Sequence, residues 1–351
     1  MALVSSHATA TPTPTPTPDW DATATHQADM VQTSVAATLT ALPTPTPTRT
    51  PTRPPTRTPQ PTDTPAPSVE ARRGAFGDKS LLGIAWTVGD VGKTDIHVAG
   101  IDGDSISSRR GLAVQSCDEA EPGWSSDGAS IVYHSNCAGS YDLYLADAAG
   151  EWTFRVTYDA ATDEREPDFA PDGQWIIYRA NAHDPNDRQD RNRNHDGDLR
   201  VVRPDGSDGY SLGIQGKGPA WSPDGDSIAF MSERTGSWDV YVFDLESGQT
   251  RQITECAEDC RWPHWSDDGG SIVFNTAIGV GRVPQEIQIV AAVGGQRRTL
   301  VSGETPGRPQ WATNGRIVFN SAQGIEVVGL DGSGRAILIA GGQNWGAAIE
   351  R

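Results

Sequence analysis

Short stretches of alternating apolar and polar residues, separated by turns rich in Gly and Pro, recur from about residue 80 to the end of the chain. A representative unit opens at Trp221, turns at Pro223-Asp224-Gly225 and continues into an apolar stretch at 228–230. An alternating stretch follows at 238–243, and Gly248 then turns the chain into 250–254. Period-two alternation between turn residues is typical of β-strands, so each unit predicts four short antiparallel strands.

The unit repeats along the chain, and its opening aromatic residue gives the period. Successive aromatics are separated by 45, 52, 44, 46 and 34 residues. They are Trp124, Phe169, Trp221, Trp265, Trp311 and Trp345. A repeat of about forty residues with four strands in each copy predicts the blades of a β-propeller, with the aromatics packed between blades.

The first and last copies are incomplete in complementary ways. Residues 82–112 provide the second, third and fourth strands of a blade, whereas the phrase around Trp345 provides only a first strand. We therefore expect the C-terminal strand to complete the N-terminal blade, which would remove a free sheet edge. The predicted fold is an all-β, six-bladed propeller over residues 76–351, closed by its C-terminal strand.

The phrase at 219–225 and the residues after it, to about 242, resemble the repeat of the TolB-like propellers. The resemblance extends over roughly residues 80–351, with Phe169 in place of Trp and Asn314 in place of Asp. It implies a propeller fold. It implies little about activity, because propellers support many unrelated functions.

Residues 1–75 are dominated by Thr-Pro tracts, which favour extended conformations and do not pack a core. We expect a disordered stalk, similar to those of exported bacterial surface proteins. Within it, Val31, Val35, Leu39 and Leu42 have helical spacing, which is compatible with a short helix over 20–42. The alternative is a disordered spacer.

The net charge of −18 lies on the predicted propeller, because the acidic and basic residues of the stalk cancel. This balance argues against nucleic-acid binding, which needs clustered Lys and Arg, and favours a basic partner. The sequence has no apolar segment of transmembrane length and no signal-peptide core after Met1. We expect a monomer with no membrane span in this chain.

Four cysteines lie in the loops of two predicted blades. Their positions predict disulfides between Cys117 and Cys137 and between Cys256 and Cys260, and a shared zinc site is the alternative. Disulfides are typical of oxidising compartments. We therefore expect a periplasmic or cell-surface location that relies on a signal or anchor upstream of Met1, the alternative being a cytoplasmic protein.

The longest spacing between aromatics contains a polar insertion at 181–198. Oxygen-bearing residues alternate there, namely Asp190, Asn192, Asn194, Asp196 and Asp198. Alternation of this kind, with Gly197 for a sharp turn, is typical of calcium loops, although the Glu of a complete EF-hand loop is missing. The sequence predicts a calcium site, and the alternative is a solvated polar loop.

Catalytic motifs are sparse. The chain has no G-x-S-x-G elbow, Gly-rich phosphate loop or H-E-x-x-H motif. The residues before the repeated aromatics differ between blades and are expected near the channel mouth, beside acid-rich loops. Among them we expect ligand contacts from Asp168, His264, Gln310 and Asn344.

The sequence therefore predicts a non-catalytic binding or scaffold propeller that recognises a protein, peptide or glycan through an acidic loop face. One alternative is a metal-dependent propeller enzyme, such as a lyase, lactonase or glycosidase. Another is the sensor end of a longer anchored receptor.

Overall fold

A computed structural model describes residues 82–90, 93–102, 105–113, 117–183, 195–278, 283–303, 307–312, 315–341 and 344–350. The predicted stalk and its helix at 20–42 lie outside these residues. The same is true of three predicted calcium ligands, Asp190, Asn192 and Asn194. All described residues belong to the unit Thr56–Arg351, which separates from Met1–Pro55.

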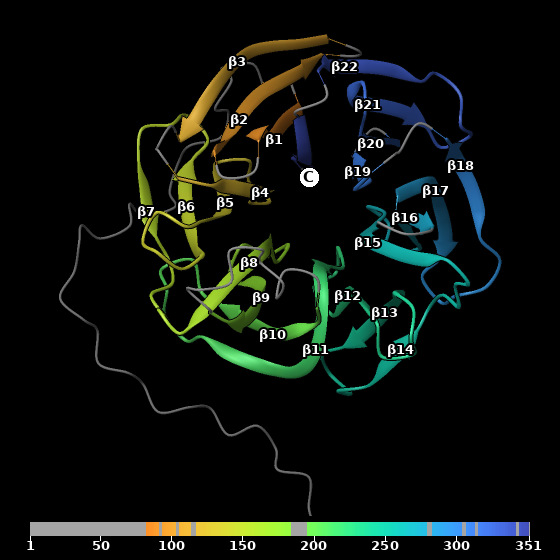
Figure 1. The fold of residues 1–351 in the computed structure, drawn as a ribbon, viewed down its shortest axis with the longest axis horizontal. Coiled ribbons are helices and arrows are strands. Elements are labelled where there is room, and N and C mark those ends of the chain that lie inside the picture. The colour runs from red at the N-terminus through yellow and green to blue at the C-terminus, as the bar shows by residue number, and fades with distance from the viewer. Residues whose placement is uncertain are drawn as a thin grey trace, which may run out of the picture. The chain divides into compact units, whose positions relative to one another are not determined.

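Wherever the structure describes the chain, every regular element is a β-strand, which confirms the all-β prediction. The strands form antiparallel sheets that succeed one another around a central axis (Figure 1). The sheet that contains both ends of the described chain comprises β23 (Asn344–Ile349), β1 (Leu82–Asp90), β2 (Lys93–Asp102) and β3 (Ser105–Ala113). The next comprises β4 (Glu119–Trp124), β5 (Ser130–Ser135), β6 (Asp142–Asp147) and β7 (Thr153–Arg155).

A seven-stranded sheet follows, with β8 (Thr162–Phe169), β9 (Ile176–Ala182), β10 (Gly197–Val202), β11 (Tyr210–Trp221), β12 (Ser227–Ser232), β13 (Asp239–Asp244) and β14 (Thr250–Gln252). The last two sheets have four strands each. One contains β15 (Asp259–Trp265), β16 (Ser271–Ile278), β17 (Val283–Ala291) and β18 (Arg298–Ser302). The other contains β19 (Gln310–Ala312), β20 (Arg316–Ser321), β21 (Gly324–Gly329) and β22 (Ala336–Ala340).

The seven-stranded sheet exists because β11 belongs to two units of the repeat. Its first half pairs with β10, where Tyr210 lies opposite Val201. Its second half pairs with β12, where Trp221 lies opposite Ile228. One long strand thus leads from the outer side of one unit to the inner side of the next, without the loop that the repeat alone suggests.

The last described strand pairs with the first. In this antiparallel ladder, Ile84 lies opposite Ile349 and Ala85 opposite Ala348. Ala347 and Ile349 are buried in the same core cluster as Trp86, and Ala348 is buried in the neighbouring cluster that contains Trp124. This is the pairing that the incomplete first and last copies of the repeat predict.

The core lies between neighbouring sheets and is built from the apolar stretches that follow each turn. Ile131, Ile228 and Ile317 are completely buried. The repeated aromatics close the gaps between units, and the indole N–H of Trp265 donates to the carbonyl oxygen of Ala220 at 3.2 Å. This position explains why the sequence repeats an aromatic there.

The Ser-x-Asp-Gly turns follow from local hydrogen bonds. The hydroxyl of Ser222 donates to Asp224 Oδ1 at 2.5 Å, and Gly225 adopts a φ of +81° that L-residues rarely take. The Ser222 hydroxyl bond, with a backbone N–H, holds the pKa of Asp224 below its usual range. These aspartates are therefore turn residues, as the repeat predicts.

A candidate binding channel

Four of the innermost strands, β4, β8, β11 and β15, contain a β-bulge at the residue that precedes a proline. The strand register shifts between Ala120 and Gly123 and at the equivalent points of the next three units. The residues at these points have left-handed backbones, with φ of 57° at Glu121, 59° at Glu166, 56° at Gly218 and 55° at Trp262. Such bulges redirect a side chain out of the strand's alternating pattern.

Only glycine adopts this backbone conformation without strain, and the residue before proline is restricted further. Among the described residues four non-glycine residues have positive φ, and three of them are Glu121, Glu166 and Trp262. At this repeated position three units thus have a large residue with a strained backbone, although Gly218 shows that glycine can form the same bulge. Concentrated strain of this kind is a feature of functional sites.

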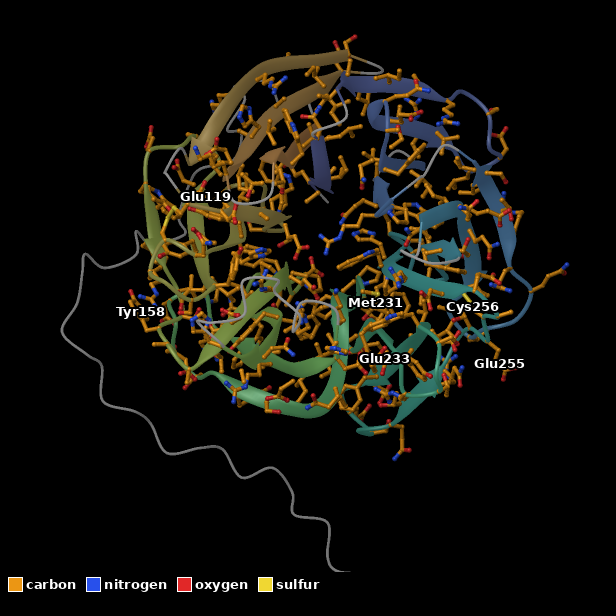
Figure 2. All side chains as sticks on the ribbon, in the orientation of Figure 1. Glu119, Tyr158, Met231, Glu233, Glu255 and Cys256 are labelled. Carbon is orange, nitrogen blue, oxygen red and sulfur yellow. A yellow bond between two sulfur atoms is a disulfide. The ribbon has the colours of Figure 1, made fainter. Side chains whose placement is uncertain are left out.

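These residues line a cavity of about 350 Å³. A ring of prolines forms much of its wall, namely Pro122, Pro167, Pro219, Pro263 and Pro309. Figure 2 shows Tyr158 on the outer rim of the ring of sheets, with Met231 further inward. These prolines contribute no backbone N–H to the wall, and polar side chains such as Glu166, Asp168 and Arg308 lie between them.

Glu166 is the most enclosed charged group of this channel. Its Oε1 and Oε2 accept from Nη2 and Nε of buried Arg179, both at 3.1 Å, and Oε2 also accepts from the Gly218 N–H at 2.8 Å. Lys217 Nζ lies 3.8 Å from Oε1. Burial by itself favours the neutral acid, but Arg179 and Lys217 outweigh it and hold the pKa of Glu166 below its usual range.

Burial has the opposite consequence for the lysine. Burial, together with the nearby Arg179, lowers the pKa of Lys217 to about 8 although Glu166 is close. The ammonium group lies 5.1 Å from the centre of the Trp262 ring. Lys217 therefore lies between the Glu166 carboxylate and the Trp262 ring.

Arg308 makes the corresponding connection to Glu121. Its Nη2 atom lies 2.8 Å from Glu121 Oε1, and its guanidinium carbon lies 3.5 Å from the centre of the Trp262 ring. Trp262 and Arg308 are half-buried, whereas Glu121 is buried. We call Glu121, Glu166, Lys217, Trp262 and Arg308 the channel array, because their contacts form a continuous series around the cavity.

The sequence-predicted ligand residues lie near the channel, but three of them have structural hydrogen bonds. Asp168 Oδ2 accepts from the backbone N–H of Trp221 at 2.8 Å, and His264 Nδ1 accepts from that of Trp311 at 3.1 Å. Asn344 does not line the cavity, and its Oδ1 accepts from Trp86 Nε1 at 3.1 Å. Gln310 lines the cavity and is half-buried.

Two of the acid-rich segments are not the exposed loops that the sequence suggests. They belong to strands β4 and β8, where Glu119 and Glu164 are only 1% and 2% exposed, whereas Glu255, in the segment before β15, is exposed. Burial raises the pKa of Glu119 to about 8 and that of Glu164 to about 7. Sequence reasoning missed this because the inner strands begin several residues before the aromatic phrase.

The two described residues of the predicted calcium loop have separate partners. Asp198 Oδ2 lies 2.9 Å from Arg200 Nε, and its Oδ1 accepts from Ser211 at 2.6 Å. Asp196 Oδ2 accepts from the Ser232 hydroxyl at 2.5 Å. Asp198 thus has a cation partner already, and a calcium site would depend mainly on Asp196 and residues outside the described ranges.

Both expected disulfides are present. Cys117 pairs with Cys137 across Cα atoms 5.2 Å apart, and Cys256 pairs with Cys260 across 6.1 Å. The first joins the segment before β4 to the turn after β5, and the second closes a short ring at the start of β15. Their presence agrees with the loop positions on which the prediction rested.

Comparison with known proteins places this fold among the propellers. The family described as the TolB beta propeller domain matches residues 210–344. The chain is 39% identical over 64 residues to the uncharacterized peptidase YuxL of Bacillus subtilis, and 45% identical over 60 residues to the TolB homolog of Chlorobium luteolum. These alignments cover 18% and 16% of this chain, and only 10% and 14% of the relatives.

Solved structures support the same conclusion. TolB from Acinetobacter baumannii has a TM-score of 0.62 at 18% identity, covering 76% of this chain and 66% of that one. A chain of a nidogen/laminin complex scores 0.62 at 8% identity, covering 77% and 98%. Puromycin hydrolase scores 0.50 at 18% identity, covering 76% and 46%. The fold is a TolB-like β-propeller. Among the described residues, no helix is long and apolar enough to cross a membrane.

Proposed function

We propose that this chain is a non-catalytic, extracytoplasmic binding propeller that holds a peptide segment of a partner protein at the channel array. The observation that carries the proposal is the half-buried stack of Arg308 on Trp262, which Glu121 orients at the edge of the cavity. Trp and Arg are the residues most enriched at the energetic centres of protein interfaces.

The backbone of the array supports a role in binding. Residues in left-handed conformations before proline cost stability, of the order of 1–3 kcal/mol each. The fold retains such a residue at Glu121, Glu166 and Trp262, where the strain places large side chains beside the cavity. Because their contacts fix Arg308 and Trp262 in advance, a ligand loses little affinity in ordering them.

We further propose that the domain has six blades and that β23 closes the ring. The β23–β1 ladder supports this arrangement, and so does the division of β11 between two units of the repeat. A closed ring gives the array a rigid frame, because each inner strand is then fixed on both sides. Sites on rigid elements hold their geometry better than sites on loops.

The proposed compartment and partner rest on charge and redox chemistry. Two disulfides in one domain favour an oxidising environment. The net charge of −18 favours the approach of a basic protein. The neighbouring structure from the nidogen/laminin complex adds a precedent, since a protein of this fold was solved there in a protein complex.

The test begins with selection of peptides from a random displayed library against the full chain. Selected peptides are titrated calorimetrically into the wild type, Trp262→Ala and Tyr158→Ala. Tyr158 is a matched control because Arg155 stacks on it at 4.7 Å, but it is 63% exposed and on the outer rim. Loss of an interface-centre Trp should weaken binding by about 30-fold or more, with no change in the control.

Equal affinity for wild type and Trp262→Ala would contradict the proposal. Enrichment of peptides that need Tyr158 would move the site to the outer rim. A parallel glycan array that yields Trp262-dependent binding, without any peptide binding, would reassign the ligand class.

A second candidate is a propeller that works with a peptidase. It is favoured by the similarity to the uncharacterized peptidase YuxL and by the shared fold of puromycin hydrolase. In this case the channel would admit short substrates. The test is hydrolysis of aminoacyl and dipeptidyl chromogenic amides by the purified full chain. Turnover that disappears in Trp262→Ala would favour this candidate over simple binding.

A further inference from the structure

Two clusters in the domain have the same composition but differ in their surroundings. Each combines two cysteines with one carboxylate, and in each the candidate ligand atoms lie within 4.8 Å of one another. One cluster contains Cys117, Cys137 and Glu119, and the other contains Cys256, Cys260 and Asp239. Both cysteine pairs form disulfides.

The carboxylates differ in their hydrogen bonds. Asp239 Oδ1 accepts from the Thr254 hydroxyl at 2.9 Å and the Cys256 N–H at 2.8 Å, and its Oδ2 accepts from Gln252 Nε2 at 3.2 Å. Glu119 is 1% exposed, and neither of its carboxylate oxygens has a partner in good hydrogen-bond geometry, since the backbone N–H of Ile96 makes only a weak contact. A buried polar group without a partner is costly, so the Glu119 carboxylate has unused capacity to bind a cation.

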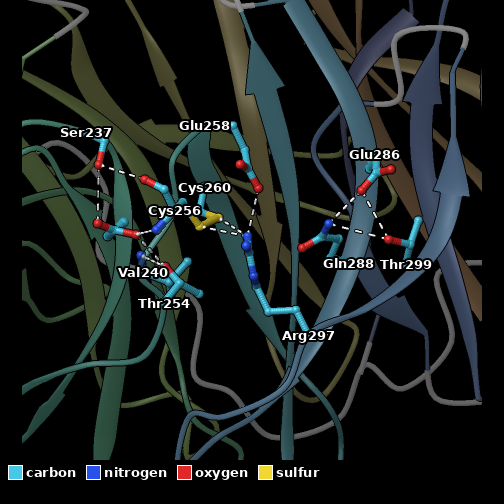
Figure 3. Close-up of polar contacts among 11 residues, drawn as sticks. Ser237, Val240, Thr254, Cys256, Glu258, Cys260, Glu286, Gln288, Arg297 and Thr299 are labelled. Carbon is cyan, nitrogen blue, oxygen red and sulfur yellow. Dashed lines mark hydrogen bonds and ion pairs between the residues drawn. A yellow bond between two sulfur atoms is a disulfide. The ribbon is translucent and has the colours of Figure 1, made fainter.

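The disulfides differ in their access to solvent. Cys137 is exposed and Cys117 is half-buried, whereas Cys256 and Cys260 are buried. Arg297 Nη1 lies 3.1 Å from Cys256 Sγ, beside Glu258, and covers the second disulfide (Figure 3). A dithiol reductant in solution therefore reaches the first disulfide and not the second.

We propose that Cys117, Cys137 and Glu119 form a zinc site that reduction of the Cys117–Cys137 disulfide creates. The dithiol reductant becomes a cyclic disulfide as it passes two electrons and two protons to the cysteines. Zinc then replaces the proton of each thiol and any proton on the Glu119 carboxyl group. No other oxidant or reductant takes part.

The ligand chemistry suits this metal. Zinc takes thiolate and carboxylate ligands in tetrahedral sites, and three protein ligands leave a fourth position for water. Two thiolates also disfavour magnesium and calcium, which prefer oxygen ligands. The fold positions the ligands closely, because Glu119 lies opposite Ser135 in the β4–β5 ladder and the cysteines flank the same two strands.

The second cluster should not bind metal, although its composition is the same. Asp239 is saturated by hydrogen bonds, and its cysteines are shielded from the reductant. The two clusters thus serve as an internal comparison. The proposed zinc site uses no residue of the channel array, although Glu121 of the array lies two residues after Glu119 on β4.

The experiment uses the full chain, treated with a dithiol under native conditions and freed of reductant without air. Alkylation and peptide mass spectrometry should find Cys117 and Cys137 free and Cys256 and Cys260 paired. Cobalt(II), a spectroscopic substitute for zinc, should give the thiolate charge-transfer absorption of a tetrahedral site. Zinc should displace it at one equivalent, and the oxidised protein should give no such band.

The variant Glu119→Gln tests whether the carboxylate is a zinc ligand or whether the two cysteines alone bind the metal. It should weaken zinc binding by more than the roughly 10–100-fold typical of losing an outer-shell partner. The matched control is the double variant Cys256→Ser and Cys260→Ser, which should bind like the wild type. Unchanged zinc affinity in Glu119→Gln would overturn the proposal, as would lost binding in the control, absence of the cobalt band, or loss of the β-sheet circular dichroism on reduction.

Discussion

The carboxylate of Asp168 accepts a hydrogen bond from the backbone N–H of Trp221, 2.8 Å away on the inner strand of the next unit. His264 makes the same kind of contact with the backbone N–H of Trp311 at 3.1 Å. Both residues therefore connect neighbouring inner strands. Their position before the repeated aromatic is suited to this connection as much as to ligand contact.

Asp168→Ala should destabilise the domain, because it leaves the Trp221 N–H without its acceptor. The expected loss is about 1–3 kcal/mol of unfolding free energy. Urea denaturation followed by Trp fluorescence measures it, with Asp172→Ala as the control at an exposed turn of the same unit. Unchanged stability together with lost peptide binding would instead make Asp168 a ligand residue.

Because the backbone at Trp262 is strained, we expect the glycine variant at this position to be more stable than the alanine variant, the reverse of the usual order. At ordinary positions Ala is more stabilising than Gly, but a left-handed residue other than Gly costs about 1–2 kcal/mol. Because both variants lack the indole, Trp262→Gly should be more stable than Trp262→Ala by about that amount. Thermal and urea unfolding of the pair provide the measurement. The usual order, with Ala the more stable, would show that the φ of +55° is not a source of strain.

Local patterns were sufficient to predict the strands, the turns and the packing of the aromatics. Ser222, Asp224 and Gly225 interact within one turn, so their sequence determines their structure. The two disulfides were also predictable, because each closes a loop within one unit of the repeat.

The channel array could not be predicted in the same way. Arg308 stacks on Trp262 and pairs with Glu121, and these residues are far apart in the sequence: Glu121 lies in β4, Trp262 in β15 and Arg308 just before β19. Their meeting depends on the ring geometry and on bulges that no single unit reveals. The acid-proline pairs at 121–122 and 166–167 were a usable signal, since a residue before proline at a repeated position suggests a constrained backbone.

Glu164 should make the domain less stable as the pH rises. Burial, together with the nearby Asp142 and Asp159, raises its pKa to about 7 in the folded protein, against hydrogen bonds from Thr157 and Thr162. Between its ordinary pKa and about 7 the folded chain holds a proton that the unfolded chain releases. The contribution of this group is therefore full at low pH and is lost as the pH rises through this range, by up to about 3 kcal/mol.

Glu164→Gln keeps the shape of the side chain without its titration. Urea unfolding at pH 4.5, 6 and 7.5 should show a gap between variant and wild type that grows in favour of the variant as the pH rises. Parallel curves at all three values would mean that Glu164 titrates normally.

Deletion of residues 342–351 should unfold or aggregate the domain. It removes β23, leaves β1 without a partner on one side and exposes the core around Ile84 and Trp86. An unpaired inner strand is a template for association between chains. Thermal melting and size-exclusion chromatography provide the measurements, and deletion of residues 1–75 is the control, for which the sequence predicts no change in melting temperature. A C-terminal deletion that melts like the wild type would exclude closure by β23.

Calcium should stabilise the chain weakly if the insertion at 181–198 binds it, as we propose from the alternation of oxygen ligands. Asp198 is already paired with Arg200, so the ion would depend on Asp196 and on Asp190, Asn192 and Asn194. Such an incomplete ligand set suggests a dissociation constant in the millimolar range. An ion that binds only the folded form adds about 2.7 kcal/mol at a hundredfold excess over its dissociation constant, so the gain at a few millimolar should be well below that.

The measurement is the melting temperature with a chelator and then with calcium restored. The double variant Asp190→Asn and Asp196→Asn should lose the response, whereas Asp205→Asn, at an exposed turn outside the insertion, should keep it. Magnesium should not substitute, because it demands a stricter octahedral site. A calcium response that survives in the double variant would place the ion elsewhere on this acidic domain. No response in the wild type would leave the insertion a polar loop whose described end is held by Ser232, Arg200 and Ser211.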